Sequence, residues 1–172
     1  MKHSLVAVLA ATVSTVAVAQ DQPAAQAPAS TWQNFEQESG SSGAIVKAAD
    51  GSQLVVKCDK PGRREVHAMI LSGDKRLAVP NDRPISRPIR FQFDNDSPTT
   101  ENWRFYEKRA EALGRTGDRA LARFIADLRN ASTLRLRLDT GIGPEVEMSF
   151  DVAGAREAVT RVYEACRDSA PA

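Results

Sequence analysis

Few residues in this sequence have the type and spacing that a chemical reaction requires. A serine or cysteine nucleophile needs a neighbouring base, most often a histidine. His67 is the only histidine beyond the third residue, and it lies in an apolar run, where a histidine packs more often than it acts as a base. Paired carboxylates can hydrolyse a glycosidic bond, but no acidic pair stands out here. The sequence therefore predicts no catalytic residue, and we expect a protein that is not an enzyme.

Metal and phosphate sites are also poorly supported. The stretch Asp94-Asn95-Asp96-Ser97 places two carboxylates two residues apart, but no later glutamate completes a calcium loop. These residues precede Pro98 and are typical of a turn. Cys58, Cys166 and one histidine lack the number and spacing of zinc ligands. Residues 141–144 read as a turn and not as a phosphate loop, because no helix follows them. We expect no metal and no cofactor.

Basic residues gather in the middle of the chain. From Arg83 to Arg137 there are 12 Lys and Arg residues against 7 Asp and Glu residues, with several aromatic residues among them. This excess predicts a surface for an acidic partner, such as a cell-wall polymer, lipid headgroups or an acidic protein. The alternative is that the aromatic residues are core and the arginines form a solvated face. The residues that we single out for the binding surface are Arg83, Arg87, Arg90, Arg104 and Arg109.

Arg135 and Arg137 form a second basic motif. They alternate with leucines over residues 134–138, and residues 146–150 alternate apolar and mostly acidic side chains after a turn. Such alternation predicts two strands that each bury one face. One interpretation makes the two arginines an anion site. The interpretation that we favour pairs them with glutamates across the strands on an exposed face.

The beginning of the chain predicts export. Residues 1–19 combine a basic start, an apolar run and the sequence Ala17-Val18-Ala19, as in a cleaved secretory signal. The apolar run is too short for a membrane anchor. There is no cysteine near the cleavage point, so we do not expect a lipoprotein. We expect a periplasmic or secreted protein with no membrane span. Export and the near balance of 23 Lys and Arg with 22 Asp and Glu argue against nucleic acid as a partner.

Three further segments follow the signal. Residues 20–30 are rich in Ala, Pro and Gln and predict a flexible leader. Residues 31–168 are expected to form a single globular domain, and residues 169–172 a tail. The two cysteines lie in the domain, and an oxidising compartment favours a disulfide between them. Two buried free thiols, or a reactive cysteine, are the alternatives.

The apolar periodicity predicts an α+β fold, with a mainly antiparallel sheet or sandwich and two helices, one of them C-terminal. One disulfide, Cys58–Cys166, would close it. Residues 102–113 fit a helix or a strand equally well. The expected strands are residues 44–47, 53–58, 65–72, 87–94, 134–138 and 146–150, and the expected helices are residues 118–129 and 153–167.

The order of these motifs resembles that of the type VI secretion-associated periplasmic accessory proteins, the TagO/VasI group. The resemblance implies a small β-rich domain framed by Cys58 and Cys166, which it carries over as a structural pair. It supplies no catalytic residue. The matching features are Trp32, a strand ending at Cys58, residues 90–94, Trp103, residues 124–128, 134–138 and 150–154, and a final helix ending at Cys166.

A second resemblance is to the invasion-associated locus B family of exported bacterial proteins. It rests on Val79-Pro80, residues 85–94 and residues 150–162. That family has further cysteines in its middle, which this sequence lacks, and it also supplies no catalytic residue.

Together these features predict an exported, non-enzymatic periplasmic accessory or binding protein, associated with a secretion system or the cell envelope. Its expected partner is an envelope protein or a cell-wall component. One alternative is an exported protein like the invasion-associated locus B family. Another is an envelope hydrolase with acidic catalytic residues that the sequence does not reveal, which would need an acid pair clustered in a cleft. The oligomeric state stays open.

Overall fold

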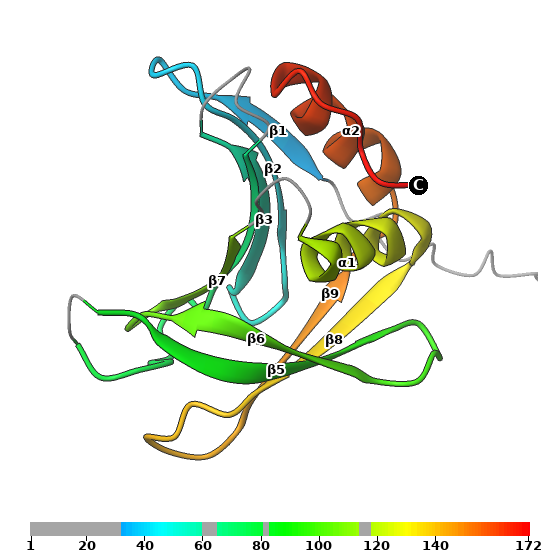
Figure 1. The fold of residues 1–172 in the computed structure, drawn as a ribbon. Coiled ribbons are helices and arrows are strands. Elements are labelled where there is room, and N and C mark those ends of the chain that lie inside the picture. Colours follow the sequence, from blue (N-terminus) through cyan, green and yellow to red (C-terminus); the bar gives the residue numbers. More distant parts are fainter. Residues whose placement is uncertain (1–31, 60–64, 81–82, 114–117) are drawn as a thin grey trace, which may run out of the picture.

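The computed structural model describes residues 32–59, 65–80, 83–113 and 118–172. The predicted signal at 1–19 and leader at 20–30 lie outside these residues. The described residues form a nine-stranded antiparallel sheet and two helices (Figure 1). The predicted α+β fold, with its second helix at the C-terminal end, is therefore confirmed. The sequence left a single sheet and a sandwich as alternatives, and the structure has a single sheet.

The strands lie in the sheet in the order β1-β2-β3-β4-β7-β6-β5-β8-β9, so β1 and β9 are its edges. Neither helix among the described residues is long and apolar enough to cross a membrane. The elements are β1 (Gln33–Glu36), β2 (Ser42–Lys47), β3 (Gln53–Cys58), β4 (Val66–Leu71), β5 (Ile85–Phe93), β6 (Thr99–Phe105), β7 (Arg109–Leu113), α1 (Arg119–Asn130), β8 (Thr133–Leu138), β9 (Val146–Asp151) and α2 (Ala155–Ala165).

The sheet is bent where β6 meets β7. These strands pair only at Arg104 with Glu111 and at Phe105 with Ala110, and beyond those pairs they diverge. In Figure 1, β1 to β3 and β7 stand upright in one arm, while β5 and β6 cross below and β8 and β9 rise behind α1. Both helices lie on the inner side of this bend. The sheet therefore has an inner face that both helices cover and an outer face that neither helix covers.

The inner face is apolar because side chains alternate along each strand. Phe91 and Phe93 of β5 and Trp103 of β6 surround Phe124 of α1, with ring centroids 5.3, 5.5 and 5.3 Å from its own. Such aromatic contacts stabilise a core by about 0.5–1.5 kcal/mol each beyond the area they bury. This cluster holds α1 against the strands that carry the site described below.

The predicted helix near residue 118 is confirmed as α1. The Asp118 side chain caps it by accepting hydrogen bonds from the N–H groups of Ala120 and Leu121, which satisfies donors that have no partner within the helix. Its buried stripe consists of Leu121, Phe124, Ile125 and Leu128, at the spacing of one helix face.

Residues 102–113, which the sequence left undecided, form the end of β6 and all of β7. The N–H of Tyr106 donates to the carbonyl of Arg109 at 2.8 Å and closes the turn between them. Trp103, Phe105 and Ala110 are buried while Arg104 is exposed, which is the two-residue alternation of strands.

The predicted disulfide joins Cys58, at the end of β3, to Cys166, immediately after α2. Their Cα atoms are 5.7 Å apart, and 108 residues separate them in the sequence. Both side chains are fully buried. The bond therefore fastens the C-terminal helix to the inner face of the sheet.

Candidate anion-binding groove

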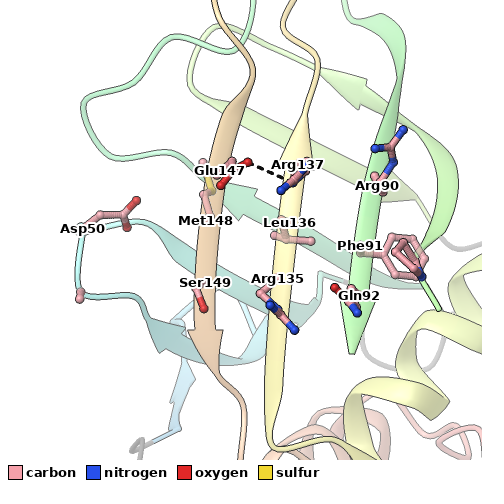
Figure 2. Close-up of a pocket in the computed structure, with 12 residues that line it drawn as sticks. Asp50, Arg90, Phe91, Gln92, Arg135, Leu136, Arg137, Glu147, Met148 and Ser149 are labelled. Carbon is pink, nitrogen blue, oxygen red and sulfur yellow. Dashed lines mark ion pairs between the residues drawn. The ribbon is translucent and has the colours of Figure 1, made fainter. Parts of the chain in front are cut away.

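The outer face of β5, β8 and β9 carries a polar surface. In the strand register, Arg90 lies opposite Arg137 and Arg137 lies opposite Glu147. Two residues further along β5, Gln92 lies opposite Arg135, and Arg135 lies opposite Ser149. The six side chains thus form two parallel rows across three neighbouring strands, as Figure 2 shows. Three of them are arginines.

These rows line a groove of about 550 Å³, which we call the arginine groove. Its strand residues are Arg90, Gln92, Arg135, Arg137, Glu147 and Ser149, together with the backbone between them. Pro98 and the turn between β2 and β3, at Ala49 and Asp50, complete the lining.

The arginines of the groove differ in their partners. Arg137 Nε lies 3.0 Å from Glu147 Oε1, so the predicted cross-strand ion pair is confirmed at this position. Arg135 faces Ser149 and not a glutamate, and its Nη2 donates to the carbonyl of Asp94 at 3.2 Å. Arg90 is exposed, and none of the hydrogen bonds or ion pairs found among the described residues includes its guanidinium.

The acidic residues of the groove are already paired with bases. Asp50 Oδ2 lies 2.5 Å from Lys75 Nζ. Burial works to raise the pKa of Asp50, but hydrogen bonds from Lys75 and the Ser52 N–H outweigh it and hold that pKa below its usual value. Glu147 is held by Arg137. Among the residues that the structure describes, no carboxylate pairs with Arg90 or Arg135, which are therefore the available cations of the groove.

The five arginines predicted as one surface do not converge. Arg83 is exposed just before β5, and Arg90 lies in the arginine groove. Arg104 is exposed on the outer face of β6, opposite Glu111. Arg109 pairs with Glu111 at 2.6 Å and stacks on the Tyr106 ring, 4.0 Å from its centroid.

Arg87, the fifth of these arginines, packs within the fold. It lies opposite Trp103 in the register, on the inner side of β5, and it is half-buried. Its guanidinium packs against the backbone of Gly141 in the turn after β8, where an added Cβ would overlap it. Arg87 thus supports that turn and presents little charge to a partner.

A smaller cavity of about 370 Å³ lies between β6, β7 and the beginning of α1. Glu101 and Asp118 both line it. The Glu101 side chain is 10% exposed, its Oε1 has no hydrogen-bond partner, and Arg123 Nη2 lies 3.6 Å from that oxygen. Burial raises the pKa of Glu101; Arg123 opposes this shift, and Asp118 and Asp127 add to it.

The carboxylate of Asp94 is used within the fold. It accepts hydrogen bonds from the N–H groups of Ser132 and Thr133 and from Thr133 Oγ1. This ties the end of β5 to the beginning of β8. Among the described residues, no group of three or more His, Cys, Asp or Glu side chains is placed to hold a metal ion.

Comparison with known sequences assigns a family. The sequence model of the YfjT family matches residues 30–159, about three quarters of the chain. The chain belongs to the YfjT family. The matched range contains every residue of the arginine groove, as well as Glu101 and Asp118, and it runs from before β1 into α2. No curated protein and no solved structure matches the chain.

The match to the YfjT family does not test the resemblance to the TagO/VasI group or to the invasion-associated locus B family. Both resemblances stay predictions. The family name YfjT assigns no ligand and no reaction. The function of this YfjT-family chain must therefore be argued from its own surface.

Proposed function

We propose that this chain is an exported, non-enzymatic binding module of the cell envelope that recognises an anionic partner through the arginine groove. The observation that carries the proposal is the pair Arg90 and Arg137. They are register partners, and like charges directly opposite each other weaken a strand pair. The Glu147 carboxylate offsets the charge of Arg137, but no ion pair found among the described residues offsets the charge of Arg90, and a bound anion would do so.

The arrangement suits carboxylate or phosphate groups. Guanidinium groups bind such anions through paired N–H donors in a fixed plane. Arg90 and Arg135 have no carboxylate partner in the described residues, while the groove's own acids are held by Lys75 and Arg137. An incoming anion would therefore meet two available guanidinium groups without first breaking an ion pair.

Photocrosslinking in intact cells tests this function. A photoreactive amino acid replaces Gln92 inside the groove, and a control replaces the exposed Lys47 at the end of β2. We expect capture of an envelope protein or a cell-wall fragment from position 92 only, and its loss when Arg90→Gln and Arg135→Gln are added. Equal capture from both positions, or none from position 92, would contradict the proposal.

Export itself rests on the signal at residues 1–19. We expect the protein recovered from the periplasm or medium to begin at Gln20, as mass spectrometry of the intact protein would report. An association with a type VI secretion system is proposed on the resemblance to the TagO/VasI group alone. Capture of a component of that apparatus in the same crosslinking experiment would support it.

A second candidate function, an envelope hydrolase, is favoured by the cavity that holds Glu101 and Asp118. A carboxyl group whose pKa is raised by burial can act as a general acid, and a second carboxylate beside it can act as nucleophile or base. The test is release of soluble fragments from purified cell wall. Release that Glu101→Gln abolishes would support the hydrolase, and release that Glu101→Gln leaves unchanged would exclude this cavity as its site.

A further inference from the structure

The strands β5, β6 and β8, all of whose residues the structure describes, carry no acidic side chain on the outer face. In each of them the outward positions alternate with those that point toward the helices. The nearest acidic side chains of the flanking strands are Glu111 of β7 and Glu147 and Asp151 of β9. The outward side chains of the three strands are Ser86, Pro88, Arg90, Gln92, Thr100, Asn102, Arg104, Thr133, Arg135 and Arg137.

Three of these arginines lie along a diagonal of the outer face, and we call them the arginine track. Arg104 of β6 is level with Ser86, at the beginning of β5. Arg90 lies further along β5, and Arg135 of β8 is level with Gln92, near the end of β5. With a rise of about 3.4 Å per residue and about 4.8 Å between strands, the track is about 22 Å long between its end Cα atoms. Figure 2 shows its Arg90–Arg135 end, which lies in the arginine groove.

The guanidinium groups of the track have no carboxylate partner among the described residues. Glu111 lies opposite Arg104, but its carboxylate is paired with Arg109 at 2.6 Å. Arg135 donates to the carbonyl of Asp94, just after β5. This acceptor carries no charge, and it directs the Arg135 side chain toward β5 and away from the acidic residues of β9. The track therefore offers three cations on one exposed surface.

The side chains around the track favour a ligand that carries hydroxyl groups as well as anionic groups. A protein interface gathers aromatic and apolar anchors at its centre, and a membrane-binding surface inserts apolar side chains beside its cations. Apart from Pro88, the outward side chains of β5, β6 and β8 are all polar. Their hydroxyl and amide groups both donate and accept hydrogen bonds, and their guanidinium groups bind carboxylates and phosphates. A polymer of acidic sugars presents both kinds of group repeatedly along its length.

We propose that the arginine track binds a linear anionic glycan, which crosses β8, β5 and β6 from Arg135 past Arg90 to Arg104. The inference rests on the proposed function and names the class of the ligand, since the arginine groove holds one end of the glycan. Acidic groups of the glycan pair with the guanidinium groups, and its sugar hydroxyls bond to the hydroxyl and amide side chains between them. Because the ligand engages several arginines at once, its affinity should rise with its length.

Oligosaccharides of defined length test the proposal on the purified full chain. The probes are a hexamer and a dimer of galacturonic acid, and a hexamer whose carboxylates are methyl esters. We expect the charged hexamer to bind, and the dimer to bind at least about tenfold more weakly, because it is too short to span the track. The methyl ester should not bind, because esterification removes the charge and keeps the hydroxyl groups. Calorimetric titration measures the three affinities.

Substitutions of exposed arginines locate the binding surface. Arg90→Gln should weaken the hexamer and the dimer by about fivefold or more, because both engage the groove. Arg104→Gln should weaken the hexamer to a similar degree and change the affinity of the dimer by less than about twofold. Arg161→Gln is the matched control, because Arg161 lies on α2, on the other side of the sheet, and it should change neither affinity.

The outcomes distinguish this inference from the proposed function. Weakening of the hexamer by Arg90→Gln and Arg104→Gln, but not by Arg161→Gln, would support both proposals. Equal affinity of hexamer and dimer, or equal weakening by all three substitutions, would overturn the track. Failure of the hexamer to bind would overturn the glycan alone if position 92 still captures an envelope protein in cells, or if vesicles of anionic lipid bind through Arg90 instead. Failure of the hexamer, the vesicles and the capture would overturn both proposals.

Discussion

Asp94 shows how one side chain can position the strands of the groove. It has a φ of 44°, a left-handed conformation that aspartate tolerates better than most residues. From there its carboxylate accepts the N–H groups of Ser132 and Thr133, and its carbonyl accepts Arg135 Nη2. The residue therefore fixes the register of β5 with β8, on which the proximity of Arg90 and Arg137 depends.

The same contacts make a pH-dependent prediction. The Thr133 N–H, together with Ser132 and the Thr133 hydroxyl, lowers the pKa of Asp94 against a smaller effect of burial. A lowered folded-state pKa means that this stabilisation is present above the unfolded value of 3.8 and is lost as the pH falls through the folded value. Asp94→Asn should reduce the melting temperature at pH 7 and flatten its fall below pH 4. Parallel melting curves of the two proteins between pH 5 and pH 2 would contradict this role.

Glu101 should behave in the opposite way. Its raised pKa means that the ionised carboxylate is the less favourable form in the folded protein, so its contribution to stability is lost as the pH rises through the folded-state pKa. Glu101→Gln should therefore be at least as stable as wild type at pH 7 and lose that advantage at pH 4. Melting temperatures across this range give the comparison. A variant clearly less stable at pH 7 would show that the Arg123 ion pair outweighs burial.

At the scale of elements, the turn between β8 and β9 sets how these two strands meet. Gly141 has a φ of 61°, which a residue with a Cβ adopts at a cost, and the Arg87 guanidinium fills the space beside it. The turn is thereby packed against β5, and it closes one end of the hairpin that carries Arg135, Arg137 and Ser149.

This packing predicts different effects for two glycines of the same turn. Gly141→Ala should destabilise the protein by about 1–3 kcal/mol, through backbone strain and displacement of Arg87. Gly143→Ala is the matched control, because nothing lies within 4 Å of its added Cβ, and it should change stability by less than about 0.5 kcal/mol. Urea unfolding measures both. Equal effects would mean that Arg87 gives the turn no specific support.

Local periodicity predicted most of these elements. The alternation over residues 134–138 and 146–150 was sufficient for β8 and β9, and the apolar stripe after Asp118 was sufficient for α1. It failed over residues 102–113, because Trp103, Tyr106 and Ala110 have helical spacing by coincidence. The turn at Tyr106 and the pairing of β7 with the distant β4 decide in favour of strands.

The groove was less predictable than the elements that form it. Alternation places Arg135 and Arg137 on one face, but only the pairing of β5 with β8 brings Arg90 beside them. The helix α1 lies between those two strands in the chain, so no local pattern could reveal the neighbours. The sequence prediction also grouped Arg87 with Arg90, although the two-residue alternation along a strand places their side chains on opposite faces of β5.

At the scale of the whole molecule, the two faces of the sheet have separate tasks. The inner face packs against α1 and α2 and is fastened by the Cys58–Cys166 bond. The outer face carries the arginine groove and contributes less to the core. Substitutions in the groove should therefore alter binding with little loss of stability, while those at the disulfide should do the reverse.

Removal of the disulfide tests the second half of that statement. A chain-entropy model gives about 4–5 kcal/mol for a loop of this size, and measured losses in small domains are about 2–5 kcal/mol. Cys58→Ala with Cys166→Ala should lower the melting temperature by on the order of 10 °C, and reduction of wild type should have a similar effect. An unchanged melting temperature would mean that the bond adds nothing to the packing of α2.

The position of this disulfide also changes how damage to the backbone would affect the molecule. All strands from β4 to β9, with both helices, lie between the two cysteines in sequence. One proteolytic cut anywhere in that interval would produce two fragments that remain covalently joined. The nicked protein would migrate as one species on a non-reducing gel and separate only after reduction. Because the fragments stay at high effective concentration, a single cut need not release either edge of the sheet from the other.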